Sequence, residues 1–431
     1  MKLGAEMHGW ATDLFPLNRS LTGDGVRDTL ARLQEILPEM EIHSVPSGTA
    51  AFDWTVPPEW NLRDAFVSDE AGTRVIDLTA TNLHVVGYSI PVDKWMTFSE
   101  LDEHLHSLPA QPDAVPYVTS FYERRWGFCL PDRLRRELRH EPDRRFHVRI
   151  DSTLASGDLS WGELVLSGSS DREVLLSTYI CHPSMANNEL SGPCVQAAIG
   201  RWIRDEVPDR HLTYRLLFTV ETLGSLVYLS KNLASLRARL IAGFVLTCLG
   251  DDRGYSRVAS RLDDTLADRV SRHVLQHDHP GYAEYSYLHR GSDERQYCSP
   301  GIDLPVCTLA RTKFGTYPEY HTSLDDLDLI TPEGLEGGFS LVRECVALLE
   351  ANGPYRCTTV GEPHLGARGL YPTLSNDDTH SSVHTMMNVI AYSDGDHDLI
   401  AIAERLGVDA RDLIELVDDL VRADVLRSVT V

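Results

Sequence analysis

Short apolar runs alternate with stretches of helical length between about residues 149 and 351, and this alternation constrains the fold more than any other feature. Each run ends at polar residues, as buried parallel strands do. Alternating strands and helices favour a doubly wound, mostly parallel α/β sheet with helices on both faces. The predicted strands are Val174–Ile180, Tyr214–Val220, Ile241–Leu249 and Leu304–Leu309, and the predicted helices lie near residues 194–206, 223–236, 263–277 and 333–351.

Two further regions differ in texture from this core. The first 40 residues indicate two helices and are followed by a short strand at Glu41–Val45, whereas residues 56–149 carry strand-like segments broken by turns. In that second region we predict strands at Thr73–Thr79 and Leu83–Ser89 and one short helix at Thr97–His106. The pattern is typical of a β-rich domain inserted into the α/β domain.

The C-terminal segment has its own pattern. Gly361–Pro372 is rich in Gly and Pro and indicates a linker. Helix, turn, helix and strand then follow over residues 399–431, an order that predicts a winged helix. We therefore predict three domains: an α/β domain from residues 1–55 and 150–358, an inserted β-rich domain over 56–149, and a winged-helix domain over 365–431.

Composition excludes several classes of protein. The chain has 431 residues, too many for one small core, and it contains no apolar run of about 18 residues that could span a membrane. The first residues lack an apolar signal core and the eight cysteines form no CxxC pair, so we expect a cytoplasmic protein with reduced thiols. A net charge of -24 argues against nucleic acid or anionic lipid as a partner.

Three of the predicted strands end at residues that could carry chemistry: His182, Glu221 and Asp251. A fourth candidate, His321, lies in a later polar loop. The carboxyl ends of parallel strands meet at one rim of the sheet, where ligands bind. Two imidazoles and a carboxylate, with one position left for water, form a catalytic zinc site suited to amide hydrolysis. We therefore take His182, Glu221 and His321 as candidate zinc ligands.

Each candidate also has a plain structural explanation. His182 can be an ordinary loop or core histidine, and Asp251 with Asp252 can form a solvated turn before Arg253. Glu221 ends an apolar strand, where an unpaired carboxylate is costly, so it needs a metal, a cation or a raised pKa. Three cysteines lie near the same rim: Cys181, Cys248 and Cys298. We expect them to be small buried apolar residues and not nucleophiles, because a reactive thiolate needs an adjacent base.

A second polar loop, His289–Cys298, places two arginines and two acids around Gly291. A guanidinium fork matches a carboxylate, so Arg290 and Arg295 are candidate substrate-binding residues. Asp293 in the same loop is a candidate catalytic carboxylate. An internal ion-pair network that fixes the loop explains the same residues equally well.

Several segments together resemble the bacterial aminopeptidase-like domain proteins, a family of unknown function found near polysaccharide or secondary-metabolite genes and similar to zinc aminopeptidases and glutaminyl cyclases. The resemblance covers nearly the whole chain, and it implies the β-rich insertion and the C-terminal winged helix. It also brings in Tyr320, beside His321, as a candidate substrate-binding residue. The segments are Pro16–Gly25, Asn82–Val86, Trp126–Cys129, Cys181–Gly192, Glu221–Ser225, Arg290–Tyr297 and Tyr320–Asp325.

This chain departs from the zinc aminopeptidases at four ligand positions. The resemblance implies a His where this chain has Tyr179, a metal-bridging Asp at Asn188, a Glu ligand at Thr222 and an Asp at Thr247. Only the base position, Glu221, and the final His, His321, are kept. Asn is a poor zinc ligand, and loss of the bridging carboxylate argues against two zinc ions. One zinc on His182, Glu221 and His321, with Asn188 at the former bridging position, and no metal at all both stay open.

Our first prediction is an aminopeptidase-like hydrolase with one zinc that acts on an amide bond of a small aminoacyl or peptidyl compound in a biosynthetic pathway. Glu221 would be ligand or general base, Asn188 and Tyr179 would orient water or substrate, and Arg290 and Arg295 would bind a charged group. The alternative is a catalytically retired binding or scaffold protein without metal.

A DNA-binding regulator is the third possibility, and it is disfavoured by charge. Residues 361–431 hold 13 acidic against 5 basic residues, whereas recognition helices need a basic footprint. We expect this module to pack on the α/β domain or to mediate self-association into a homo-oligomer.

Overall fold

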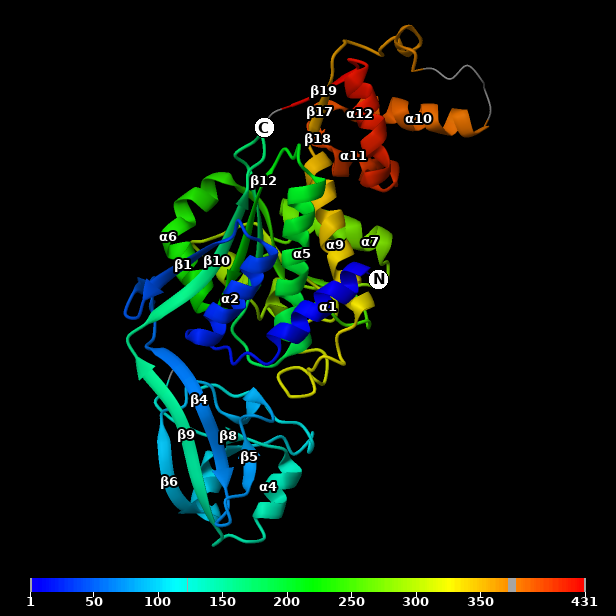
Figure 1. Cartoon of the computed structure of the whole chain (residues 1–431). Coiled ribbons are helices and arrows are strands. Elements are labelled where there is room, and N and C mark those ends of the chain that lie inside the picture. Colours follow the sequence, from blue (N-terminus) through cyan, green and yellow to red (C-terminus); the bar gives the residue numbers. More distant parts are fainter. Residues whose placement is uncertain (1, 122, 371–376, 430–431) are drawn as a thin grey trace. The chain divides into compact units, whose positions relative to one another are not determined.

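An eight-stranded mixed sheet forms the centre of the protein (Figure 1). The structure is a computed structural model and describes residues 2–121, 123–370 and 377–429, with only the backbone of 377–382. The strand order is β1-β10-β12-β11-β13-β16-β14-β15, and the pairs β11·β12, β11·β13, β13·β16 and β14·β15 are parallel. The predicted α/β class with a mostly parallel sheet is therefore confirmed. The strands are β1 (Glu41–Pro46), β10 (Asp158–Leu166), β11 (Glu173–Tyr179), β12 (Thr213–Thr219), β13 (Leu240–Leu246), β14 (Ser256–Val258), β15 (Ala283–Tyr285) and β16 (Val306–Ala310).

Helices cover both faces of this sheet. On β10, a Cβ at Gly162 would meet Leu30 of α2, while the neighbouring Trp161 packs edge-on against Tyr228 of α6 at 6.5 Å between ring centroids. Because adjacent residues of a strand point to opposite faces, α2 and α6 lie on opposite sides. The helices are α1 (Lys2–Leu14), α2 (Asp24–Ile36), α5 (Ser191–Glu206), α6 (Leu223–Arg239), α7 (Leu266–Asp278), α8 (Glu294–Tyr297) and α9 (Pro332–Ala351).

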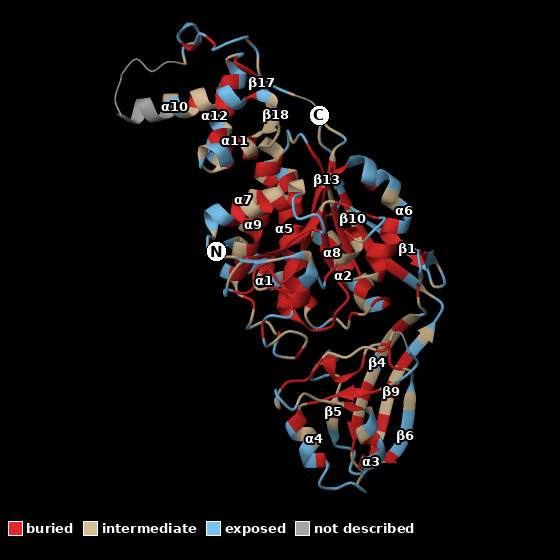
Figure 2. Cartoon of the chain, turned by 180° about the vertical axis from the view of Figure 1, so that it is seen from behind, coloured by how far each residue is buried: buried red, intermediate tan, exposed pale blue. Residues whose placement is uncertain are grey.

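The central strands are apolar on both faces, and this explains why they are buried (Figure 2). Every residue of β11 and β16 is buried, and β12 and β13 are buried except for Arg215 and Ile241. These are the runs whose alternation with helices predicted the sheet.

The inserted region forms a separate antiparallel sheet of order β5-β4-β9-β6. It has its own apolar core, which includes Phe98, Phe128 and Phe146. Its strands are β4 (Glu59–Ser68), β5 (Arg74–Asp77), β6 (Val92–Thr97) and β9 (Arg145–Ala155); shorter elements are β2 (Ala50–Ala51), β3 (Trp54–Thr55), β7 (Leu105–His106), β8 (Phe128–Cys129), α3 (Phe98–Leu101) and α4 (Asp132–Leu138).

The predicted strand Leu83–Ser89 is wrong. Residues Asn82–His84 form a 3₁₀ turn, η1, because the Thr81 side chain accepts a hydrogen bond from the Leu83 backbone N–H and caps the turn. Val85 and Gly87 then make only isolated bridges, with Phe128 and Thr119.

The chain divides into two compact units, Met1–Asp268 with Gly281–Val342 and Arg269–Pro280 with Arg343–Val431. The second contains the predicted helices and final strand of the winged helix, and also a helix and two strands that the sequence did not predict. Its strand order is β18-β17-β19. Of the predicted linker, Leu365–Arg368 forms a 3₁₀ turn, and residues 371–372 lie outside the described residues. The elements are β17 (Pro354–Cys357), α10 (Asp377–Tyr392), β18 (Asp394–Asp398), α11 (Leu399–Leu406), α12 (Ile414–Arg422) and β19 (Leu426–Ser428).

Within the described ranges, no helix combines the length and the apolar character needed to cross a membrane.

Candidate functional site

The ends of three neighbouring strands bring the candidate residues to one rim of the central sheet. β11 ends at Tyr179, β12 at Thr219 and β13 at Leu246, so the residues that follow them share the same edge. After β11 the chain forms a π-helical turn, η3 (Ala186–Leu190), that runs directly into α5, so the helix begins at Ser191, a few residues before its predicted start near residue 194. Gly192 permits this close packing, because a Cβ there would lie 2.4 Å from the carbonyl oxygen of Leu246.

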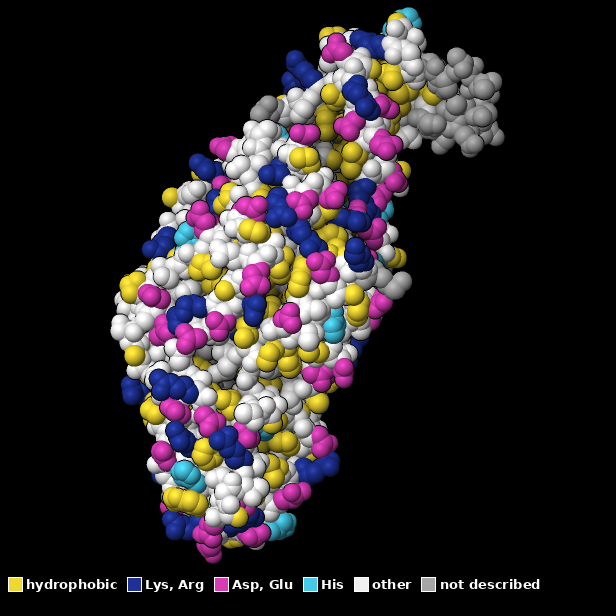
Figure 3. All heavy atoms as spheres, in the orientation of Figure 1, with side chains coloured by type: hydrophobic (Ala, Val, Ile, Leu, Met, Phe, Trp, Pro, Cys, Tyr) yellow, Lys and Arg dark blue, Asp and Glu magenta, His cyan; other side chains and the backbone are white. Residues whose placement is uncertain are grey.

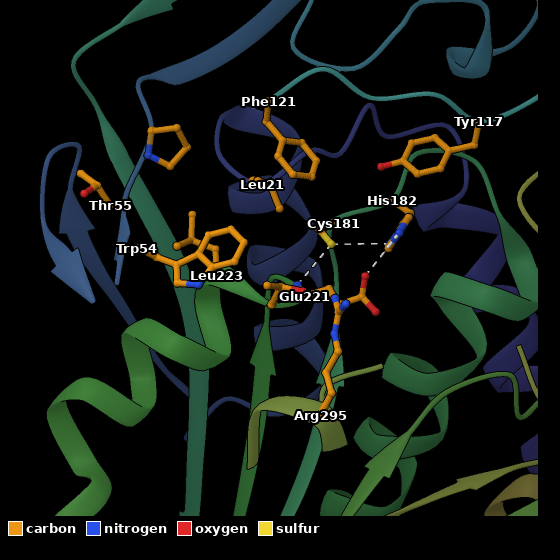
Figure 4. Close-up of a pocket in the computed structure, with 12 residues that line it drawn as sticks. Leu21, Trp54, Thr55, Tyr117, Phe121, Cys181, His182, Glu221, Leu223 and Arg295 are labelled. Atoms are coloured by element: carbon orange, nitrogen blue, oxygen red, sulfur yellow. Dashed lines mark hydrogen bonds and ion pairs between the residues drawn. The ribbon is translucent and has the colours of Figure 1, made fainter. Parts of the chain in front are cut away.

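His182 and Glu221 meet at a cavity of about 170 Å³ (Figure 4). His182 Nε2 lies 3.8 Å from Glu221 Oε2. The cavity is smaller than the roughly 300–1,000 Å³ typical of pockets for drug-sized ligands, so it suits a small compound. One part of its wall is apolar and another is polar; the lining residues are Leu21, Trp54, Thr55, Pro57, Tyr117, Phe121, Cys181, His182, Glu221, Thr222, Leu223 and Arg295.

Two buried ionisable residues, Arg19 and Glu189, hold His182 from behind, and burial raises the pKa of Glu189 well above its usual range. His182 Nδ1 lies 2.7 Å from Glu189 Oε2, and Arg19 Nε donates to the His182 carbonyl oxygen at 2.9 Å. The Arg19 and Glu189 side chains are fully buried and approach to 3.9 Å. Burial lowers the pKa of His182 to about 3, so its imidazole is neutral. A proton on Nδ1 would donate to Glu189 and leave the lone pair of Nε2 facing Glu221.

Glu221 lies among other ionisable groups. Burial raises its pKa well above the usual range, and the nearby Asp293 raises it further. Asp293 does not line the cavity; its Oδ1 accepts a hydrogen bond from the Thr222 backbone N–H at 2.7 Å, and burial raises its pKa to about 6. Arg295 donates to the Thr222 hydroxyl. Asp293 therefore acts on Glu221 through the adjacent backbone and through charge.

Four non-glycine residues around the rim have positive φ, a conformation that costs free energy and collects at functional sites. They are Ser184 (φ 37), Thr222 (φ 64), Cys248 (φ 52) and His321 (φ 57). Each of these residues follows or faces the end of a strand of the central sheet. The strained backbone is therefore located at the candidate site.

His321 approaches the same rim from a later loop. Its ring centroid lies 5.4 Å from that of His182, and Tyr117 of the inserted region lies 5.1 Å and 5.2 Å from the two. Tyr320 stacks on His321 at 3.9 Å. Burial lowers the pKa of His321 to about 3, so this imidazole is neutral as well.

Three of the four substituted ligand positions hydrogen-bond to one another. The Tyr179 hydroxyl lies 2.9 Å from Asn188 Oδ1 and 2.5 Å from Thr247 Oγ1, and Thr247 also donates to the Asn188 carbonyl oxygen at 3.1 Å. We call these three residues the neutral triad. The buried Asp325 fixes the backbone here, because its carboxylate accepts hydrogen bonds from Asn187 and Asn188 N–H at 2.6 Å and 3.0 Å.

The donor types suit one zinc ion and not two, and the structure brings two of the three candidate ligands, His182 and Glu221, close together. His182 and Glu221, with a neutral His321 nearby, offer the nitrogen and oxygen donors zinc takes, and Glu189 is placed as the outer partner that ligand histidines have. His321 would have to come closer, because among the described residues it belongs to no group of three or more potential ligands whose donor atoms lie within 4.8 Å of one another. The neutral triad lies at three of the positions where the family resemblance implies ligands, and it carries no charge to hold a second ion.

One tighter cluster occurs among the described residues, formed by Cys181, His182 and Glu189. Cys181 Sγ lies 3.5 Å from His182 Nδ1, the atom that Glu189 also approaches. Because two of the groups share one ring nitrogen and Arg19 lies beside Glu189, we interpret the cluster as hydrogen bonding. Burial also raises the pKa of the Cys181 thiol, which argues against a thiolate nucleophile.

Several predicted residues lie away from the cavity. Tyr179, Arg290 and Tyr320 do not line it, and Arg290 is exposed, with its guanidinium over the ring of Tyr287. Among the four predicted substrate-binding residues, only Arg295 lines the cavity. The solvated turn expected at Asp251 is wrong: this side chain is 1% exposed and binds Thr312 and Asn187.

The sequence analysis missed Arg19, Glu189, Asp325 and Tyr117. Arg19, Glu189 and Asp325 lie inside the segments that resemble the family. Ionisable residues in those segments were therefore the signal that could have identified them as site residues. Tyr117 had none, because its place depends on how the inserted region meets the rim.

This sheet with its strand-end site defines an aminopeptidase-like fold. The zinc aminopeptidase of Bacillus subtilis superimposes with a TM-score of 0.56 at 13% identity, over 80% of this chain and 94% of that chain. A peptidase M28 precursor from Shewanella amazonensis gives 0.57 at 13% identity, over 84% and 95%. At these identities the likeness concerns the fold alone.

Residues 8–352 match the model of the domain of unknown function DUF4910, and residues 353–428 match a winged helix-turn-helix model. The chain belongs to the DUF4910 family. A relative from Clostridium acetobutylicum is 39% identical over 430 residues, which is 99% of this chain and 97% of that protein; it is described as a candidate polysaccharide biosynthesis protein with an aminopeptidase-like domain. The crystal structure of a candidate peptidase from C. acetobutylicum has a TM-score of 0.92 at 38% identity, over 99% and 97% of the two chains.

Proposed function

We propose that this protein is an amide hydrolase that acts on a small aminoacyl or peptidyl compound in a biosynthetic pathway. The observation that carries the proposal is the approach of His182 Nε2 to Glu221 Oε2, 3.8 Å apart, at a cavity on the strand-end rim. The aminopeptidase-like fold supports the reaction class, and the biosynthetic name of the C. acetobutylicum relative supports the setting.

In this proposal Glu221 is the general base that takes a proton from the attacking water. Burial raises the pKa of Glu221 above its ordinary range, and a raised pKa makes the carboxylate form a stronger base. Asp293 holds the Thr222 backbone and so fixes the direction of Glu221. Arg19 and Glu189 fix the His182 ring with Nε2 towards Glu221.

His182 and His321, with Glu221 beside them, would hold one zinc. When bound, this ion supplies Lewis-acid polarisation of the amide carbonyl and lowers the pKa of water. Both imidazoles are neutral because burial lowers their pKa values, so they can act as ligands without losing a proton first.

Metal analysis of protein purified without chelator tests the zinc assignment. We expect about one zinc per chain, lost in His182→Ala and reduced in His321→Ala, while His289→Ala, an exposed histidine, keeps it. A wild-type protein without metal would end the zinc version. A panel of aminoacyl amides tests the reaction, and turnover unchanged in Glu221→Gln would end the role of Glu221.

A catalytically retired binding protein is the second candidate function, and the neutral triad favours it. Tyr179, Asn188 and Thr247 hydrogen-bond to one another as neutral side chains, at positions where the family resemblance implies charged ligands or a histidine. Compounds from the same panel that bind wild-type protein without turnover would support this candidate over the hydrolase.

We further propose that the winged-helix unit does not bind nucleic acid. Its α12 exposes acids such as Glu415, Asp418 and Asp419. On the face shown in Figure 3, acidic and basic side chains are interspersed, without a broad area of Lys and Arg. Gel-shift assays with genomic fragments should show no retained complex at physiological salt, and a salt-sensitive shift would contradict this. Self-association of the chain, which we expect of this module, is measurable by sedimentation.

A further inference from the structure

Arg295 reaches the cavity from α8 and ends beside Glu221 (Figure 4). Its hydrogen bonds at the cavity are few: one Nη donates to the Thr222 hydroxyl, whereas Nε is buried and has no acceptor. In the part of the chain that the structure describes, no carboxylate forms a direct ion pair with this guanidinium. A guanidinium placed in this way is costly unless a ligand completes its hydrogen bonds.

The acids nearest in sequence bind other donors. Asp293 Oδ1 accepts the Thr222 N–H at 2.7 Å. Glu294 accepts the Gly291 N–H at 2.7 Å and the Thr308 hydroxyl at 2.8 Å. Within the described residues no direct ion pair holds Arg295, and its positive charge acts on Glu221 and Asp293 at longer range, where it lowers the pKa of both carboxyl groups.

Arg215 shows what a structural arginine looks like in the same fold. Its guanidinium contacts Glu173 through Nε at 2.7 Å and also pairs with Glu163. Arg295 has no such partner, and it faces a cavity, whereas Arg215 lies on a strand of the sheet.

The rest of the cavity selects an apolar group. Trp54, Pro57 and Phe121 line it together with Leu21 and Leu223. The small volume, about 170 Å³, leaves room for one side chain and its neighbouring groups rather than an extended peptide.

We infer that Arg295 binds a carboxylate of the substrate, so the substrate class is a small compound with an apolar side chain and a free carboxylate near the scissile amide, such as a dipeptide or an N-acyl amino acid. The inference rests on the proposed function for the cleavage step, but the binding it describes does not need turnover. A guanidinium fork pairs with a carboxylate through two charge-assisted hydrogen bonds, which a neutral amide cannot offer.

The test compares glycyl-L-phenylalanine, which has a single apolar side chain, with its C-terminal amide by calorimetric titration against wild-type protein. We expect the acid to bind about tenfold or more tightly than the amide. Arg295→Met should remove this preference, and Arg295→Lys, which keeps the charge without the fork, should restore part of it. Arg290→Met is the matched control, because Arg290 is in the same loop but exposed, and it should keep the full preference.

Thermal unfolding of each variant shows whether it is folded, and the Lys variant keeps the test open if the Met variant is not. A preference for the acid that survives Arg295→Met overturns the inference, as does equal binding, or no binding, of the two compounds to wild-type protein. Equal loss of affinity for acid and amide in Arg295→Met also overturns it, since Arg295 would then serve only to offset Glu221 and Asp293. Turnover of the same pair separates the two proposals: acid-selective binding without hydrolysis contradicts the hydrolase and leaves the inference standing.

Discussion

Two neighbouring parts of the strand-end rim are built on opposite electrostatic principles. On one side, His182 and Glu221 approach each other at a cavity, with the buried ionisable side chains of Arg19 and Glu189 behind them. On the other side, the neutral triad of Tyr179, Asn188 and Thr247 is buried, hydrogen-bonded and uncharged.

This difference indicates which of the two parts of the rim can take part in catalysis. Buried ionisable groups without full partners are costly, and on the His182 side the atoms Arg19 Nη2, Glu189 Oε1 and Arg295 Nε are buried without a hydrogen-bond partner. On the other side, the Tyr179 and Thr247 hydroxyls and the two Asn188 carbonyl oxygens lie within hydrogen-bond distance of one another, and the two hydroxyl protons can serve two of these three contacts. Asn188 Nδ2 is also buried without a hydrogen-bond partner, but this atom is uncharged. We therefore place reaction on the first half and a supporting role on the second, and the following variants test that division.

Glu221→Gln should have the largest effect. Loss of the general base should lower kcat by about 10²–10⁴-fold against aminoacyl amides, while the protein stays folded. Glu319→Gln is the control, because this carboxylate is paired with Arg253 and does not line the cavity. Equal activity of the two variants would show that the part of the rim with His182 and Glu221 does not carry the reaction.

Tyr179→Phe should act on stability rather than on turnover. The change removes a hydroxyl from the neutral triad and leaves Asn188 Oδ1 buried without its donor, which should lower the free energy of unfolding by about 1–3 kcal/mol. Denaturant unfolding measures this. A loss of turnover as large as that in Glu221→Gln, with unchanged stability, would show that the supporting half takes part in the reaction.

His182 should make stability depend on pH. Its pKa is 6.5 when exposed and about 3 in the folded protein, so the unfolded chain binds an extra proton below pH 6.5. The stability from this group is therefore full above pH 6.5 and is lost as the pH falls towards 3. At pH 5.5 the loss is about 1.4 kcal/mol. Denaturant unfolding of wild-type protein and His182→Gln, both in chelator, measures this at pH 7.5 and 5.5. The difference between their free energies of unfolding should shrink by this amount at the lower pH, and an unchanged difference would contradict the prediction.

Much of the fold was predictable because the central strands are apolar on both faces, a pattern that few other structures produce. Strands β11, β12 and β13 begin and end within a few residues of their predicted bounds. The sequence did not predict β18, because its residues, Asp-Gly-Asp-His-Asp, do not alternate between apolar and polar as a strand does. The strand predicted at Leu83–Ser89 is absent, because Thr81 caps a 3₁₀ turn at its start.

The candidate site was predictable only to the level of which residues share a rim. Parallel topology brings His182 and Glu221 together because their strands are both in the centre of the sheet. The partners that set their state come from elsewhere in the chain: Arg19 precedes α2, and Tyr117 comes from the inserted region. Contacts between distant segments of this kind depend on the loop paths, and residue spacing does not encode them.

A double-mutant cycle on Tyr179→Phe and Thr247→Val should show the smallest effect and resolves whether the neutral triad acts as a unit. The two hydroxyls lie 2.5 Å apart, so each single change already breaks their shared hydrogen bond. The free energies of unfolding should then be non-additive, with a coupling of about 0.5–1.5 kcal/mol. Pairing Thr247→Val with Ser177→Ala gives the control cycle, because Ser177 bonds Tyr297 instead and should be additive with Thr247. Additivity in the first cycle would mean that the substituted ligand positions are separate packing residues, and the contrast between the two halves of the rim would reduce to the charges on one of them.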